Sequence, residues 1–171
     1  CNYYGNKFAF QHIFDATDLG KIKNESYGTI LSSHCLEYVA NPIKALFRWS
    51  QILNSKGKML LILPHKIGNF DHKRNDATID HLISDYKKNI CEDDMTHYDE
   101  TIKLHDLDRR LGVKISLAEH IKLSKNNFKN RYMYHHVFSK KLIFKVLEFC
   151  NFEIINYLEK NEDLITFCQK K

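Results

Sequence analysis

The feature that most constrains the fold is the apolar run KMLLILP at residues 58–64. A strand that faces water on one side alternates apolar and polar residues, whereas a strand buried on both sides is apolar throughout. This run follows a turn at Gly57 and is stopped by Pro64. It therefore predicts a buried strand in a sheet that is covered on both faces, as in α/β proteins.

Strand and helix patterns alternate on both sides of this run. Asn41 and Pro42 are a capping residue followed by proline at the first helical position, and the apolar spacing after them predicts a helix over 42–53. A second amphipathic helix is predicted over 139–150. Further strands are predicted at 11–14 and 27–33, both buried, and at 152–159 and 163–170. This order predicts an α/β domain with a mostly parallel sheet that ends in an antiparallel hairpin.

The segment 65–135 has a different character from its flanks. It is polar and consists of short helical patterns, and the chain shows neither repeats nor linkers. We therefore expect residues 1–171 to form a single domain with a helical, histidine-rich insertion at about 65–135. Histidines and carboxylates in such numbers can bind metal ions or sugar hydroxyls, but they are also ordinary surface residues, and their spacing fits no standard zinc pattern. The histidines are His72, His81, His97, His105, His135 and His136.

Composition excludes several classes of protein. No apolar run approaches the roughly 18 residues that a membrane span needs, and no signal-peptide pattern opens the chain. Five cysteines without a CxxC pair argue against a disulfide framework and against a cysteine zinc site. The formal charge of +5 is too small to argue for an anionic partner. We expect a cytoplasmic protein without a membrane span, provided that Cys1, which is not a natural translation start, is not a processed end.

The most specific pattern in the chain lies at residues 15–66, DATDLGKIKNESYGTILSSHCLEYVANPIKALFRWSQILNSKGKMLLILPHK. It resembles the middle of the class I S-adenosylmethionine-dependent methyltransferases, and the last helix and hairpin resemble that family's ending. The phrases NFDHKR, EDDMTHYDE, LHDLDRR and YHHVF resemble a subgroup associated with glycan and surface-polysaccharide genes. The resemblance implies a Rossmann-like methyltransferase sheet, S-adenosyl-L-methionine as cofactor, and methyl transfer to a sugar hydroxyl in glycan biosynthesis.

One departure from the family concerns the cofactor. The family's first strand carries a glycine-rich loop, and its second ends in an acidic residue for the ribose hydroxyls, by the same logic as in dinucleotide folds. In this sequence no two of the six glycines are closer than eight positions, and residues 1–10 leave no room for two strands. Without those two strands, the strand at 11–14 lacks its usual neighbours. The chain is then a fragment, receives the strands from another chain, or has a rearranged fold, and we favour the fragment.

The resemblance also assigns residues to the cofactor. Asp15 and Ala16 match the element that contacts the adenine, although Asp15 could instead cap the turn that follows its strand. Ser32, Ser33 and His34 stand where the second predicted strand ends, at the sheet edge where open α/β folds bind ligands. His34 could act as a general base, or it could be an ordinary core histidine.

Two further groups of residues are candidates for chemistry. His34, Glu37 and His65 lie near the positions of the Glu/His metal ligands of some metal-dependent class I methyltransferases, in which a divalent metal orients a sugar diol. Tyr38 departs from that pattern, because it stands where the usual phrase has histidine. His72 and His135 each lie in a family-like phrase and are candidate catalytic residues, with a plain surface role as the alternative.

The sequence leaves hypotheses of different classes open. The first is a sugar O-methyltransferase, or a portion of one, with a glycan substrate and a fused or associated glycosyltransferase. The second is a methyltransferase-like module that binds or scaffolds without catalysis. Nucleic-acid methylation is a third, but the basic residues near 122–131 fit a solvated surface better than a nucleic-acid face. An unpaired sheet edge would also allow homo-oligomerisation.

Overall fold

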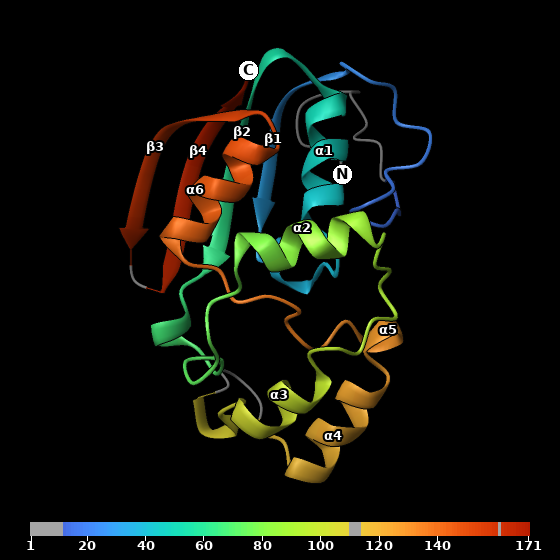
Figure 1. The fold of residues 1–171 in the computed structure, drawn as a ribbon, viewed down its shortest axis with the longest axis vertical. Helices are drawn as coiled ribbons and strands as arrows, with labels where there is room; N and C mark the ends of the chain where they lie inside the picture. The colour runs from blue at the N-terminus through green and yellow to red at the C-terminus, as the bar shows by residue number, and fades with distance from the viewer. Residues whose placement is uncertain (1–11, 110–113, 161) are drawn as a thin grey trace, which may run out of the picture.

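A computed structural model describes residues 12–109, 114–160 and 162–171 of the chain, and its centre is a four-stranded sheet in the order β1-β2-β4-β3 (Figure 1). The strands are β1 (Tyr27–Ser33), β2 (Leu53–Pro64), β3 (Phe152–Lys160) and β4 (Asp163–Lys170). β1 runs parallel to β2, whereas β4 pairs antiparallel with both β2 and β3. The predicted α/β fold with a C-terminal antiparallel hairpin is confirmed, but the described sheet is mixed rather than mostly parallel, because β4 pairs antiparallel with β2 as well as with β3.

Two helices cover one face of this sheet. The Asn41 side chain accepts a hydrogen bond from the Lys44 backbone N–H and so caps α1 (Pro42–Ile52), which ends one residue earlier than predicted because Leu53 joins β2. The other helix is α6 (Lys140–Phe149). Both pack on the side of β2 that carries Met59, Leu61 and Leu63, and together they form the hydrophobic core.

The opposite face of the sheet differs from the expectation. Leu31 of β1 and Leu158 of β3 are 76% and 51% exposed, and the register places both on the side away from α1 and α6. Within the described residues, no helical layer packs on that side. The prediction that both faces are covered is therefore wrong for this part of the chain, and so is the prediction that 27–33 is a buried strand.

The segment before β1 contains no regular strand. Residues 12–14 have irregular structure, and Asp15 takes part only in an isolated bridge with Asp18. A strand is stabilised by its hydrogen-bonded neighbours, and β1 pairs only with β2 in the described part of the chain. The strand predicted at 11–14 is thus wrong over 12–14, and residue 11 lies outside the described residues. Instead, Ala16 is held by its carbonyl oxygen, which accepts a 2.9 Å hydrogen bond from the Trp49 indole N–H.

The segment between β2 and α6 is mainly helical. α2 packs against α1 and α6, while α3 and α4 contact each other farther from the sheet (Figure 1). Many of the histidines here are interior rather than surface residues, and His120, His135 and His136 are buried. No helix in the described part is both long enough and apolar enough to cross a membrane. The elements are α2 (Ile79–Lys87), α3 (Tyr98–Leu104), α4 (Leu117–Lys125), α5 (Asn127–Asn130) and the short 3-10 helices η1 (Leu36–Tyr38), η2 (Lys66–Gly68) and η3 (Leu107–Arg109).

Candidate functional site

The parallel strands β1 and β2 end side by side, and a cleft of about 590 Å³ opens at that edge. Ligands of open α/β sheets bind outside the carboxyl ends of parallel strands, so the cleft lies where the fold predicts a site. We call it the carboxyl-edge cleft. Its lining combines polar and aromatic side chains, from His34, Tyr38, Pro64, Gly68, Asn69, Phe70, Arg109, Tyr134, Glu162 and Asp163.

His34 is the first residue after β1 and stands in this cleft. Its backbone has a positive φ of 48°, a left-handed conformation that a non-glycine residue adopts only at a cost. Its Nε2 lies 3.1 Å from Asp163 Oδ1, and 46% of its side chain is exposed. It is therefore an accessible imidazole oriented by a carboxylate, rather than a buried core histidine.

Glu37 lies beside His34 and is only 1% exposed. Its Oε1 is 3.7 Å from His34 Nδ1, and neither carboxylate oxygen has a hydrogen-bond partner among the described residues. Burial raises the pKa of Glu37 to about 7, against a weaker lowering by the backbone N–H of Glu37 itself, which lies too unfavourably to count as a hydrogen bond. A carboxyl group that titrates near neutrality next to an imidazole can exchange protons with it.

A second cavity of about 470 Å³ lies along the free edge of β1, and we call it the β1 pocket. Three of the residues predicted to bind cofactor, Ala16, Ser32 and Ser33, line it together. The Ser32 hydroxyl is buried without a hydrogen-bond partner in the described part of the chain. The rest of the lining is mostly apolar: Leu19, Ile22, Tyr27, Thr29, Ile30, Leu31, Cys35, Trp49 and Ile52.

Asp15 adjoins the β1 pocket through Ala16, and its carboxylate already has partners. Oδ1 accepts hydrogen bonds from the Thr17 backbone N–H and hydroxyl, and Oδ2 accepts one from Arg131 Nη2. Burial alone would raise the pKa of Asp15, but the Thr17 hydrogen bonds and the Arg131 guanidinium lower it overall. Asp15 is therefore an ionised acceptor at neutral pH, with the turn-capping geometry that was its alternative interpretation.

The structure does not bring the three predicted catalytic histidines together. His72 Nε2 lies 2.9 Å from Asp106 Oδ2, and His72 lines neither the carboxyl-edge cleft nor the β1 pocket. His135 is buried, with Nε2 3.2 Å from Asn127 Nδ2. Burial, and then the neighbouring His136, lower the pKa of His135 to about 3. Of the three, only His34 stands at the carboxyl edge of the sheet.

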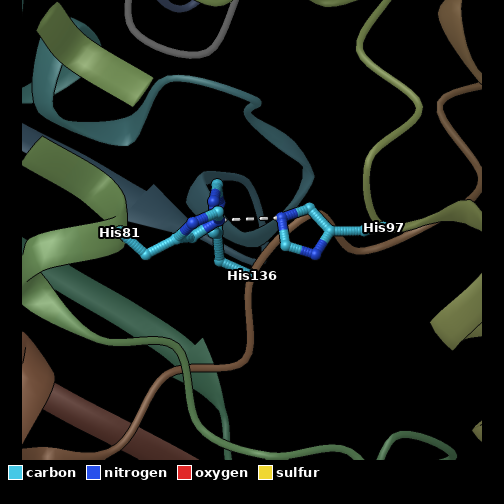
Figure 2. A group of neighbouring side chains, drawn as sticks. All are labelled: His81, His97 and His136. Atoms are coloured by element: carbon cyan, nitrogen blue, oxygen red, sulfur yellow. Dashed lines mark hydrogen bonds between the residues drawn. The ribbon is translucent and has the colours of Figure 1, made fainter. Parts of the chain in front are cut away.

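The predicted metal set is not assembled either. His65 Nδ1 accepts a hydrogen bond from the Ile67 backbone N–H at the start of η2, so this nitrogen is occupied. Within the described ranges, one group of metal-ligating side chains converges, and it consists of His81, His97 and His136 (Figure 2). Sequence reasoning named these histidines only as members of the insertion.

Sequence reasoning also missed residues of the carboxyl-edge cleft. Asp163 is the first residue of β4 and pairs in register with Pro64, the last residue of β2. This antiparallel pairing carries the Asp163 carboxylate to the end of the neighbouring strand and toward His34. The signal that could have found it was the predicted hairpin, once its register against β2 was considered.

The chain matches no protein-family model and no curated protein sequence. Solved structures do match it. A SAM-dependent methyltransferase from Methanosarcina mazei superposes with a TM-score of 0.52 at 14% identity, over 92% of this chain and 65% of its own. A protein from Listeria monocytogenes assigned to the same class gives 0.51 at 15% identity, over 91% and 66%.

A third match is an S-adenosylmethionine-dependent methyltransferase from Mesorhizobium loti, with a TM-score of 0.51 at 12% identity. It covers 92% of this chain and 67% of its own. The chain thus spans about two thirds of the length of the solved structures it matches, and identities this low establish the fold alone. The fold of this chain is similar to that of these methyltransferase structures, with a Rossmann-like mixed sheet.

Proposed function

We propose that this chain is part of an S-adenosylmethionine-dependent O-methyltransferase that acts on a sugar hydroxyl. The proposal rests on one observation at the end of β1. The consecutive residues Ser33 and His34 line two different cavities, Ser33 the β1 pocket and His34 the carboxyl-edge cleft. One cavity is mostly apolar and the other contains an oriented imidazole. A methyltransferase needs this combination, because its cofactor and its acceptor must meet at one point.

The β1 pocket fits the adenosine end of the cofactor. An adenine ring requires a mostly apolar slot with a few polar groups at its rim, and Trp49, Ile30 and the buried Ser32 hydroxyl supply these. The ionised Asp15 next to the pocket is an acceptor for an exocyclic amine. When bound, S-adenosyl-L-methionine would supply an electrophilic methyl group. The described residues include no glycine-rich turn for the methionine end.

His34 is placed to receive the proton of the acceptor hydroxyl. Asp163 holds the Nε2 side of the ring, which leaves Nδ1 to accept a proton. An imidazolium formed there would lie between the Asp163 carboxylate and Glu37, and its positive charge would be stabilised by Asp163 and by Glu37 in its ionised form. Positioning and deprotonation are the main tasks of the protein in such an in-line displacement.

The lining of the carboxyl-edge cleft supports a sugar as the acceptor. Asn69, Arg109 and Glu162 present donors and acceptors, and Phe70 and Tyr134 present aromatic rings. This mixture suits a sugar. The phrases of the insertion resemble a glycan-associated subgroup, so the proposal includes a role in glycan biosynthesis. It also places the protein in the cytoplasm, with a fused or associated glycosyltransferase as partner. Divalent-metal assistance at the acceptor and homo-oligomerisation through β1 stay predictions.

The cofactor assignment is tested by titrating S-adenosylhomocysteine into the 171-residue chain by calorimetry. We expect a dissociation constant in the micromolar range, which corresponds to a binding free energy of roughly −8 kcal/mol. Asp15→Ala should weaken binding about tenfold, the usual worth of a hydrogen bond to a charged group. Asp18→Ala, a nearby aspartate in the same turn region, should bind like the wild type. A folded chain that binds none contradicts the proposal and favours a binding or scaffolding module.

The role of His34 is tested by replacing it with asparagine. We expect kcat for transfer of radiolabelled methyl to a panel of free and nucleotide-activated sugars to fall about a hundredfold, the lower end for a lost general base. The dissociation constant of S-adenosylhomocysteine should change little. His12→Asn, an exposed histidine before the sheet, is the matched control. An unchanged kcat in His34→Asn would remove His34 from the mechanism.

A further inference from the structure

Three histidines from separate segments of the chain converge on one another. His81 lies on α2, His97 directly precedes α3, and His136 lies in the segment between α5 and α6 (Figure 2). Each offers a ring nitrogen, and the three nitrogens lie within 4.8 Å of one another. We call these three residues the histidine cluster. They are distinct from the predicted set of His34, Glu37 and His65.

Asp85 adds a carboxylate to the histidine cluster. It stands one helical turn after His81 on α2, and its Oδ2 lies 3.2 Å from both His81 Nε2 and His136 Nε2. The Nε2 atoms of His81 and His97 are 3.0 Å apart. Ligand atoms around a tetrahedral ion with bonds of about 2.0–2.1 Å are ~3.3 Å from one another. The separation between His81 Nε2 and His97 Nε2 is therefore close to that of two ligands on one tetrahedral ion, whereas Asp85 is not among the side chains that all converge.

Hydrogen bonding alone satisfies this arrangement poorly. A contact between two Nε2 atoms can use only one proton, and the Nδ1 of the buried His136 has no hydrogen-bond partner among the described residues. A cation at the centre would use one lone pair from each of the three rings. Its charge would also offset the Asp85 carboxylate, which is largely buried.

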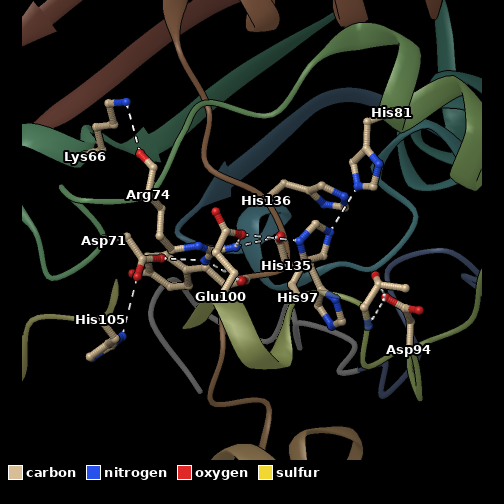
Figure 3. Close-up of polar contacts among 12 residues, drawn as sticks. Lys66, Asp71, Arg74, His81, Asp94, His97, Glu100, His105, His135 and His136 are labelled. Atoms are coloured by element: carbon tan, nitrogen blue, oxygen red, sulfur yellow. Dashed lines mark hydrogen bonds and ion pairs between the residues drawn. The ribbon is translucent and has the colours of Figure 1, made fainter. Parts of the chain in front are cut away.

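The surroundings support the orientation of the rings. His97 Nδ1 lies 3.7 Å from Glu100 Oε2, and Glu100 in turn accepts a hydrogen bond from Arg74 (Figure 3). Carboxylates behind ligating histidines commonly fix the ring orientation at metal sites. A small cavity of about 210 Å³ reaches the cluster and is lined by His81 and His97. An ion can therefore enter from solvent, and a small exchangeable ligand has room beside it.

We propose that His81, His97 and His136 bind one divalent first-row transition-metal ion of the zinc or cobalt class, with the Asp85 carboxylate beside two of the rings. Imidazole nitrogens suit such ions, whereas calcium and magnesium require oxygen ligands. The site is separate from the carboxyl-edge cleft, so the proposal does not depend on the methyltransferase function.

The test is a cobalt titration of the full chain after treatment with a chelator and dialysis. Co²⁺ in a four-coordinate site of nitrogen and oxygen donors absorbs visible light, so the titration reports both stoichiometry and geometry. We expect saturation at one equivalent, displacement of Co²⁺ by one equivalent of Zn²⁺, and a higher melting temperature with either ion. A folded chain that shows no saturable visible band, and binds no Zn²⁺ by calorimetry, overturns the proposal.

Variants locate the site. His81→Ala and His97→Ala should each lower the Co²⁺ affinity at least a hundredfold, and Asp85→Asn at least tenfold, since even residues behind the ligands are worth 10–100-fold. His81 is partly exposed, so its variant should fold, and circular dichroism checks this. His65→Ala and His12→Ala should bind like the wild type. Binding lost in His65→Ala but retained in His81→Ala would overturn the proposal and place the metal at the predicted set.

Discussion

Replacing Arg74 by alanine is expected to lower the free energy of unfolding by about 3–5 kcal/mol, because it leaves the buried Asp71 carboxylate without its guanidinium partner. Arg74 is 2% exposed, and its Nη1 donates to Asp71 Oδ2 at 2.9 Å and to the Tyr134 carbonyl oxygen at 2.8 Å. Its Nη2 donates to Glu100 and to the His135 carbonyl oxygen (Figure 3). One side chain thus fixes the segment after β2 against the segment before α6. Urea unfolding followed by circular dichroism measures the loss.

A matched ion pair at the surface provides the control. Lys66 pairs with Asp76 at 2.6 Å, but both side chains are partly exposed to water. Exposed pairs contribute about 0–1 kcal/mol, so Asp76→Ala should change the free energy of unfolding by no more than that. Similar losses in Arg74→Ala and Asp76→Ala would mean that the buried contacts of Arg74 add nothing, and would contradict the structure of this network.

Elements with strong local signals could be predicted from the sequence. The Asn41-Pro42 start of α1, the apolar core of β2 and the C-terminal hairpin were each specified by residues within a few positions of one another. Capping, proline geometry and continuous hydrophobicity act locally, so they can be recognised without knowledge of the partner elements.

The errors involve partners that are distant in sequence. Residues 12–14 have an apolar pattern, but a strand also needs a neighbour with free hydrogen-bonding groups, and composition does not reveal one. Leu31 looks like a core residue, yet its burial depends on a layer over the far face of the sheet. Local hydrophobicity therefore predicted the strand β1 correctly but not its environment.

The two candidate sites show the same limit. His34 was predicted at the carboxyl edge because strand ends determine that location. The histidine cluster could not be predicted, since α2, the start of α3 and the segment before α6 are brought together only by the packing of an irregular insertion. Histidine spacing along the chain carries little information when the ligands come from segments 16 and 39 positions apart.

Glu37 should make the protein less stable as the pH rises from about 4.5 to 7, and Glu37→Gln should remove this effect. Burial raises the pKa of Glu37 from its ordinary 4.5 to about 7 in the folded chain. Below pH 4.5 both the folded and the unfolded chain hold the proton, so Glu37 causes no loss. Between pH 4.5 and 7 only the unfolded chain releases the Glu37 proton. The free energy of unfolding therefore falls, by about 3 kcal/mol in total by pH 8.

The neutral amide of Glu37→Gln has nearly the same shape, so the variant should match the wild type at pH 4 and exceed its free energy of unfolding by about 3 kcal/mol at pH 8. Urea unfolding at both pH values measures the difference, and the exposed Glu153→Gln is the control that should show none. A constant difference across pH would mean that Glu37 titrates normally. A difference that depends on pH would mean that the buried carboxyl group beside His34 destabilises the folded chain. Such a destabilising group is expected at a functional site.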